Sequence, residues 1–181
     1  RPQCVQLRTQ QGWTRNGPYS QARVGLSIRE DRQDRFVFGK ATEKWDGIVD
    51  HIPPTEQDTV YRQKLMKAEV HDERAYYLNG VAGHAGLFSS AGDLAVYCQM
   101  LLSKGSYAER RYLDTSVVEQ FTQRQSDHAN RGYGFDRKSD GFSTAGSLTS
   151  DKTFGHTGFT GTSYWIDPER DMAIIILTNR V

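Results

Sequence analysis

The sequence has little that could anchor the chain in a membrane or hold it to a charged partner. Its longest uninterrupted apolar run is the six residues Met172 to Leu177, whereas a membrane-spanning helix needs about 20. Lys and Arg total 23 and Asp and Glu total 22, which leaves a net charge of +1. Nucleic acids and anionic membranes are held by excess positive charge. We therefore expect no membrane span and no nucleic-acid partner.

Cysteine is also scarce. Only Cys4 and Cys98 occur, which is too few for the disulfide framework of a small secreted domain. Cys98 falls on the apolar face of a predicted helix, where a buried free thiol is the favoured interpretation. A Cys4–Cys98 disulfide is the alternative, so the cysteine content does not fix the cellular compartment.

The short motifs that mark most large enzyme classes are missing as well. The sequence contains no G-x-S-x-G, no H-E-x-x-H, no C-x-x-C and no phosphate-binding G-x-x-x-x-G-K-[ST]. His71, Asp72, Glu73 and His84 have side chains that can bind a divalent metal, but their spacing fits no standard site. A hydrogen-bonded structural cluster is the favoured interpretation, and we expect no metal.

One helix is strongly indicated after Ser90, which forms an S-x-x-[DE] capping box with Asp93. Apolar residues then recur at helical spacing until Gly105 ends the pattern: Leu94, Tyr97, Cys98, Leu101 and Leu102. We expect Leu94 and Leu101 to lie in the core. A second helix is expected to begin near Asp114 or Thr115, with Val117, Val118 and Phe121 on one face.

The remaining pattern favours short strands and loops around these helices. Strands are predicted at 24–28, 36–38, 132–135, 154–157, 162–166 and 172–177, a polar helix at 55–70 and a Ser/Thr/Gly-rich loop at 139–152. Helices followed by an antiparallel meander indicate the α+β class. We expect an N-terminal segment of unclear origin at residues 1–50, with a possible β-hairpin, followed by a second region at 51–181.

Two glycine-rich segments could let a ligand approach the backbone. Gly80 to Ser90 places three glycines and small residues around His84, and Gly155 to Gly161 places His156 and Thr157 between glycines. Glycine lacks a Cβ and so permits close approach of main chains. A tight structural turn is the alternative for each segment taken alone.

Taken together, these segments resemble the C-terminal part of a known family. Val70 to Glu73, Gly80 to Leu94, Arg131 to Phe135 and Phe154 to Val181 resemble the serine β-lactamase and penicillin-binding-protein-like hydrolases, in their class C-like and esterase-like branch. The resemblance runs from about Ile52 to Val181. It implies an antiparallel sheet flanked by helices, and we expect a partial or internally deleted version of that fold.

The resemblance also implies a chemistry. In such hydrolases a serine attacks an amide, ester or β-lactam carbonyl while backbone N–H groups hold the oxyanion. His156, Thr157 and Gly158 would be the catalytic strand residues, with Phe159 providing the oxyanion N–H. Phe159, Thr160 and His84 would contact substrate. The implied substrates are cell-wall D-Ala-D-Ala peptides, β-lactams or small esters, with no organic cofactor and an extracytoplasmic location.

The sequence departs from the family at the nucleophile. No Ser in this chain has a Lys three residues later, so the family's S-x-x-K motif is missing and no nucleophile can be assigned. The family triplet commonly begins with Lys, and here it begins with His156. Two alternatives therefore stay open: a catalytically silent homologue that binds a cell-wall peptide or a protein, and a structural domain of a larger fusion protein. The missing remainder of its own domain is a further expected partner.

Overall fold

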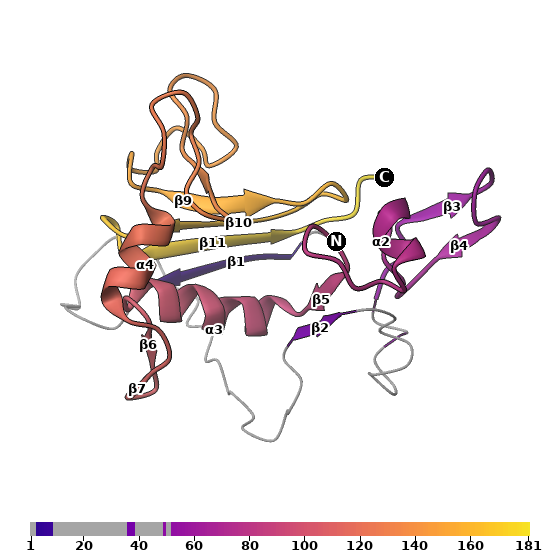
Figure 1. The fold of residues 1–181 in the computed structure, drawn as a ribbon, viewed down its shortest axis with the longest axis horizontal. Coiled ribbons are helices and arrows are strands. Elements are labelled where there is room, and N and C mark those ends of the chain that lie inside the picture. The colour runs from indigo at the N-terminus through magenta and orange to yellow at the C-terminus, as the bar shows by residue number, and fades with distance from the viewer. Residues whose placement is uncertain (1–2, 9–35, 39–48, 50–51) are drawn as a thin grey trace.

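A five-stranded antiparallel sheet forms the centre of the computed structural model, which describes residues 3–8, 36–38, 49 and 52–181 (Figure 1). The strands lie in the order β1 (Gln3–Arg8), β11 (Met172–Leu177), β10 (Thr162–Asp167), β9 (Phe154–Thr157) and β8 (Asp136–Arg137). The predicted strands at 154–157 and 172–177 are confirmed, and β10 extends one residue beyond its predicted end. β1 is not predicted from the sequence, although Val5 and Leu7 alternate with Gln6 and Arg8.

Helix α3 (Ala91–Leu102) lies along one face of this sheet, as Figure 1 shows. The Ser90 side chain accepts a hydrogen bond from the Asp93 N–H, so Ser90 caps the helix at the predicted position. Small side chains let the helix approach the sheet closely, and its buried residues are Ala91, Ala95, Cys98 and Leu101. The prediction for Leu101 is confirmed, whereas Leu94 is only partly buried. Cys98 is a free, fully buried thiol, as expected.

The core lies between α3 and the sheet face that it covers. Four strand residues complete the buried cluster on that face: Phe154, Ile166, Ala173 and Ile175. Helix α4 (Thr115–Thr122) adds Val118, while Val117 and Phe121 of the same predicted face are 37% and 46% exposed. Together the helices and the antiparallel sheet confirm the α+β class.

The predicted polar helix at 55–70 is wrong. This stretch forms a hairpin of β3 (Glu56–Asp58) and β4 (Lys64–Met66). The carboxylate of Asp58 accepts hydrogen bonds from the N–H groups of Val60, Tyr61 and Arg62. A side chain that binds three successive backbone donors stabilises a turn in place of a helix.

The predicted strand at 132–135 is also wrong. The Tyr133 N–H donates to the Phe121 carbonyl at 2.8 Å, and Gly134 has a φ of 75°. This stretch is therefore a turn that docks on the end of α4, and β8 begins only at Asp136. The Ser/Thr/Gly-rich stretch at 139–152 has no strand or helix, as predicted.

The remaining elements are short. Strand β2 (Phe36–Phe38) confirms the predicted strand there and pairs with β5 (Leu87–Ser89), while the other half of the predicted hairpin, at 24–28, lies outside the described residues. Helix α2 (Glu73–Tyr77) follows the β3–β4 hairpin, and β6 (Ser106–Tyr107) pairs with β7 (Arg110–Arg111). In the described part of the chain, no helix is long and apolar enough to cross a membrane.

Candidate active site at the end of strand β9

The outer edge of β9 is only half covered. β8 pairs Asp136 with Gly155 and Arg137 with Phe154, and no described strand lies beyond them. His156 and Thr157 therefore continue β9 past the end of its outer neighbour. An uncovered strand edge presents main-chain groups to which an extended ligand can add.

Gly155 fixes the position of His156 on this edge. A Cβ built at Gly155 would lie 2.0 Å from the Tyr164 carbonyl oxygen and 2.9 Å from Trp165. No side chain fits there, so glycine allows β9 and β10 to keep the register that pairs His156 with Tyr164. Directly opposed residues share a face of the sheet, which places His156 on the face that α3 covers.

The His156 ring is half-buried and binds its own strand. Its Nδ1 lies 2.7 Å from the Thr157 carbonyl oxygen. A carbonyl oxygen only accepts, so Nδ1 carries the proton and Nε2 of a neutral ring is left as an acceptor. Thr157 is exposed beside it.

A tight turn joins β9 to β10. The Gly158 N–H donates to the Thr162 carbonyl at 2.7 Å, and the Gly161 N–H donates to the Gly158 carbonyl at 3.1 Å. Within the described residues the N–H of Phe159 has no acceptor. This donor is at the position that the family resemblance implies for an oxyanion contact. The Thr160 carbonyl accepts from the Arg180 N–H, which ties the turn to the residues after β11.

Phe159 also connects the turn to the segment before α2. Its side chain is 78% exposed, and its ring stacks on the imidazole of His71 with a centroid distance of 5.5 Å. His71 Nδ1 in turn lies 3.3 Å from the Thr55 hydroxyl and 3.5 Å from a carboxylate oxygen of Glu56. The stack could not be found from sequence spacing, because its two residues belong to distant elements.

His84 lies in the neighbouring glycine-rich segment. Its Nε2 is 2.9 Å from Asp72, whose side chain also caps α2 through the Ala75 N–H. The hydrogen bond from Ala75, followed by that from His84, lowers the pKa of the Asp72 carboxyl below its usual value. The interpretation of these residues as a hydrogen-bonded cluster agrees with these contacts. Among the described residues, no group of three or more His, Cys, Asp or Glu could hold a metal.

The predicted site residues are therefore brought together in part. His156 to Thr160 form one continuous strand end and turn, and Phe159 links them to His71. His84 does not contact the turn. It contacts Asp72, the residue that follows His71 in the sequence. Sequence reasoning considered His71 only as part of a metal or structural cluster and missed its contact with the turn. Gly86 has a φ of 97°, and a Cβ there would lie 2.0 Å from the Gly80 carbonyl oxygen, so the expected close backbone approach exists in that segment.

This arrangement of sheet, covering helix and open strand end defines the class to which the chain belongs. Residues 23–181 match the Beta-lactamase family, and the chain is a member of that family. A Salmonella gallinarum protein provisionally named a D-alanyl-D-alanine carboxypeptidase is 44% identical over 138 residues, and a Salmonella typhi protein of the same name is 43% identical. Each alignment covers 75% of this chain and 30% of the relative. The chain thus spans less than a third of the curated relatives that it matches.

The fold is shared with solved structures. The octameric penicillin-binding protein homologue from Pyrococcus abyssi aligns with 81% of this chain and 30% of its own, with a TM-score of 0.52 and 19% identity. This likeness shows the β-lactamase and penicillin-binding-protein fold. A β-lactamase from Mycobacterium bovis aligns with 53% of this chain at 26% identity and a TM-score of 0.46.

Proposed function

We propose that this chain supplies the substrate-binding strand of a serine hydrolase that acts by acyl transfer. The observation that carries the proposal is the end of β9, where no described strand covers His156 and Thr157 and the Phe159 N–H has no described acceptor. An acyl compound could add its backbone to this edge and place its carbonyl oxygen near the Phe159 N–H. A preorganised N–H donor at that position stabilises the negative charge of a tetrahedral intermediate.

Family membership and the residue at the start of the triplet support a proposal for the substrate class. D-Ala-D-Ala peptides of the cell wall, β-lactams and small esters all present an acyl carbon to a serine, and such peptides are met outside the cytoplasm. A lysine at position 156 would offer an ammonium group to a substrate carboxylate, whereas the His156 ring uses its Nδ1 to bind the Thr157 carbonyl and presents Nε2 as its other polar atom. We therefore favour esters or amides without an obligatory free carboxylate.

The nucleophile is not assigned within these 181 residues, because no S-x-x-K sequence occurs in them. The proposal assigns the nucleophile to further sequence of the same protein, which is consistent with relatives that this chain covers to only 30%.

A second candidate function, a catalytically silent module that binds cell-wall peptides, is favoured by the same missing motif. In that case the open edge of β9 would bind a peptide without cleaving it. A third alternative, a structural domain of a larger polypeptide, would need neither a nucleophile nor peptide binding at this edge.

Covalent labelling combined with peptide binding separates these functions. The 181-residue chain is treated with fluorescent penicillin and with a fluorophosphonate, and its binding of diacetyl-Lys-D-Ala-D-Ala and of the methyl ester of the same peptide is followed by NMR line broadening. We expect no label on this chain and weak peptide or ester binding that Thr157→Pro abolishes, since proline removes an edge N–H. The exposed Thr144→Pro, in the loop at 139–152, is the matched control. The longest natural protein that contains the chain should be labelled.

Each result has a definite meaning. A label on the isolated 181 residues would contradict the assignment of the nucleophile outside them. Peptide binding with no label on the longer protein would favour the silent module. Absence of both binding and labelling would overturn the proposal and leave the structural domain.

A further inference from the structure

Phe159 carries a large apolar ring at the position of the proposed oxyanion donor. The residue is 78% exposed, and within the described residues its N–H has no acceptor. Because the ring and the N–H belong to one residue, a carbonyl group bound to this N–H has its two substituents within reach of the ring. The Phe159 side chain is therefore placed to contact the part of a substrate next to its reacting carbon.

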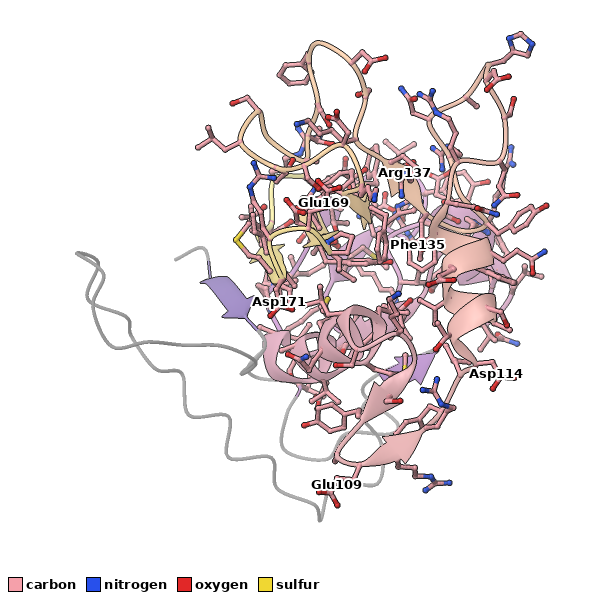
Figure 2. All side chains as sticks on the ribbon, turned by 90° about the vertical axis from the view of Figure 1, so that its left-hand side faces the viewer. Glu109, Asp114, Phe135, Arg137, Glu169 and Asp171 are labelled. Carbon is pink, nitrogen blue, oxygen red and sulfur yellow. The ribbon has the colours of Figure 1, made fainter. Side chains whose placement is uncertain are left out.

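A buried aromatic pair elsewhere in the fold gives a comparison. Phe135 is 8% exposed, packs edge to face on Phe154 at a centroid distance of 5.3 Å, and is surrounded by other side chains in Figure 2. Phe159 has one ring partner among the described residues, the imidazole of His71, which stacks on it. A stacked partner covers one face of a ring, so the opposite face of Phe159 stays open to a ligand.

His71 is held firmly behind the Phe159 ring. Its side chain is 15% exposed, and Nδ1 lies 3.3 Å from the Thr55 hydroxyl. Its carbonyl accepts a hydrogen bond of 2.6 Å from Arg62. The Arg62 side chain is itself buried and pairs with the carboxylates of Glu56 and Asp58. A partner fixed by several contacts loses little conformational freedom when a ligand joins the stack.

The two sides of the stack are also joined through the residues after β11. The Arg180 N–H donates to the Thr160 carbonyl in the turn at 3.1 Å. The Asn179 side chain donates to the Pro54 carbonyl, just before the β3–β4 hairpin that leads to His71. Turn and hairpin thus share one anchor, so the stack is formed before any ligand binds.

We propose that the open face of Phe159 selects substrates in which a planar apolar group, such as a phenyl ring, is attached next to the scissile carbonyl, and that His71 positions this ring. The inference rests on the proposed hydrolase function. Two aromatic rings stack with an offset, and the gain over a saturated ring of the same size corresponds to a preference of about two- to tenfold. The planar group belongs to either the acyl side or the leaving-group side of the carbonyl, and each is tested.

The longest natural protein that contains the chain is assayed with two pairs of esters. Ethyl phenylacetate and ethyl cyclohexylacetate differ in the ring on the acyl side. Benzyl acetate and cyclohexylmethyl acetate differ in the ring on the leaving-group side. Within each pair the carbon number is the same, so the ratio of kcat/KM for the phenyl and cyclohexyl esters reports how strongly a planar ring is preferred. The pair whose ratio depends on Phe159 identifies the side of the substrate that contacts the ring.

Two variants and a control are compared with the wild type. Phe159→Leu keeps the N–H and an apolar side chain but removes the ring, so it should lower the ratio by about two- to tenfold. Its kcat/KM for the cyclohexyl esters should stay within about threefold. His71→Leu removes the support of the ring and should lower the ratio through KM more than through kcat. Phe142→Leu, at a ring that is 91% exposed in the loop at 139–152, should leave both ratios unchanged.

Binding to the 181-residue chain separates failure of this inference from failure of the proposed function. Saturation-transfer NMR compares phenylacetamide with cyclohexylacetamide, and N-benzylacetamide with its cyclohexylmethyl counterpart. Hydrolysis with the same ratios in wild type and Phe159→Leu would overturn the inference and leave the hydrolase intact. No hydrolysis, together with phenyl-selective binding that Phe159→Leu abolishes, would contradict the hydrolase and support the role of the ring. Absence of selectivity in both assays would overturn the inference.

Discussion

The imidazole of His71 stacks on the ring of Phe159, with the two planes 23° apart. His71 precedes α2, whereas Phe159 is in the turn after β9, so the contact closes a long loop of the chain. It is reinforced by Arg62, which donates to the His71 carbonyl at 2.6 Å. The position of the proposed oxyanion donor therefore depends on a segment that precedes α2.

The stack should be measurable as a coupling energy. In a double-mutant cycle of Phe159→Leu and His71→Leu, we expect a coupling of about 0.5–1.5 kcal/mol, the range for aromatic pairs. Denaturant unfolding of the wild type, both single variants and the double variant provides the measurement. Phe142 is 91% exposed, so Phe142→Leu combined with His71→Leu is the matched control and should be additive. Additivity of the Phe159 cycle would contradict the stack.

Leu101 should be a major contributor to stability, because it is 5% exposed in the cluster between α3 and the sheet. Leu101→Ala should reduce the free energy of unfolding by about 2–5 kcal/mol, the usual cost of emptying a buried leucine site. Leu148→Ala, at a side chain that is 85% exposed, should change it by less than about 0.5 kcal/mol. A denaturant melt of both variants tests the difference, and equal small effects would mean that α3 does not cover the sheet.

Asp167 should make stability depend on acid pH. Burial acts to raise the pKa of its carboxyl, but hydrogen bonds from the Ser150 hydroxyl and N–H, at 2.6 and 2.7 Å, and from Arg170 lower it overall. A depressed pKa in the folded state stabilises the fold above the unfolded pKa of about 3.9, and this contribution is lost as pH falls toward the folded pKa. Asp167→Ala should cost about 2–4 kcal/mol at neutral pH.

The pH dependence of the melting temperature separates the contribution of the Asp167 charge from that of its packing. Asp167→Asn should flatten the fall in melting temperature below pH ~4, whereas the exposed Asp140→Asn should leave it unchanged. Thermal melts at a series of acid pH values provide the test. If Asp167→Asn followed the wild-type curve, the carboxylate would not be the group that titrates.

Cys98 should be inert in the folded protein. Burial raises the pKa of its thiol to about 12, and only the thiolate reacts rapidly with disulfide reagents. In a Cys4→Ser background, we expect no reaction with dithionitrobenzoate at pH 8 and stoichiometric reaction after unfolding in guanidinium. Rapid labelling of the native protein would show that α3 is not packed on the sheet as described.

His156 should affect substrate selection in the complete enzyme. If it lines the cleft, His156→Ala should lower kcat/KM for ester and amide substrates, and His156→Lys should favour the matched substrates that have a free carboxylate. The comparison needs substrate pairs with and without that group. If kcat/KM stays within about twofold for both, a loss below ~0.5 kcal/mol, His156 does not contact substrate. Ser163→Ala, at the next strand position outside the turn, is a suitable control.

The parts of the fold that follow from local patterns were predictable. α3 has a capping box sequence and an apolar stripe, and β9, β10 and β11 have strand-forming runs, the last two joined by a turn at Asp167-Pro168. The hairpin at 55–70 was not predictable, because the pattern of its polar residues suggests a helix. The turn depends on Asp58, whose carboxylate accepts hydrogen bonds from three backbone N–H groups. The apolar spacing at 132–135 was equally misleading, since the Phe121 carbonyl holds that stretch in a turn.

The candidate site divides in the same way. His156, Thr157 and Gly158 could be proposed from the sequence because they form one short motif, which lies within β9 and its turn. The contact between Phe159 and His71 arises only when β9 and the segment before α2 meet in three dimensions.

The pairing of β1 with β11 protects the edge of an apolar strand from aggregation. β11 is the most apolar stretch of the sequence, and its two edges are covered by β10 and by residues Gln3–Arg8. A chain without those residues would expose a β-rich edge with no proline, glycine or charge, which are the features that normally block aggregation. Preparations trimmed by proteases at the N-terminal end should therefore form oligomers and fibrils, even though every residue of the candidate site would still be present.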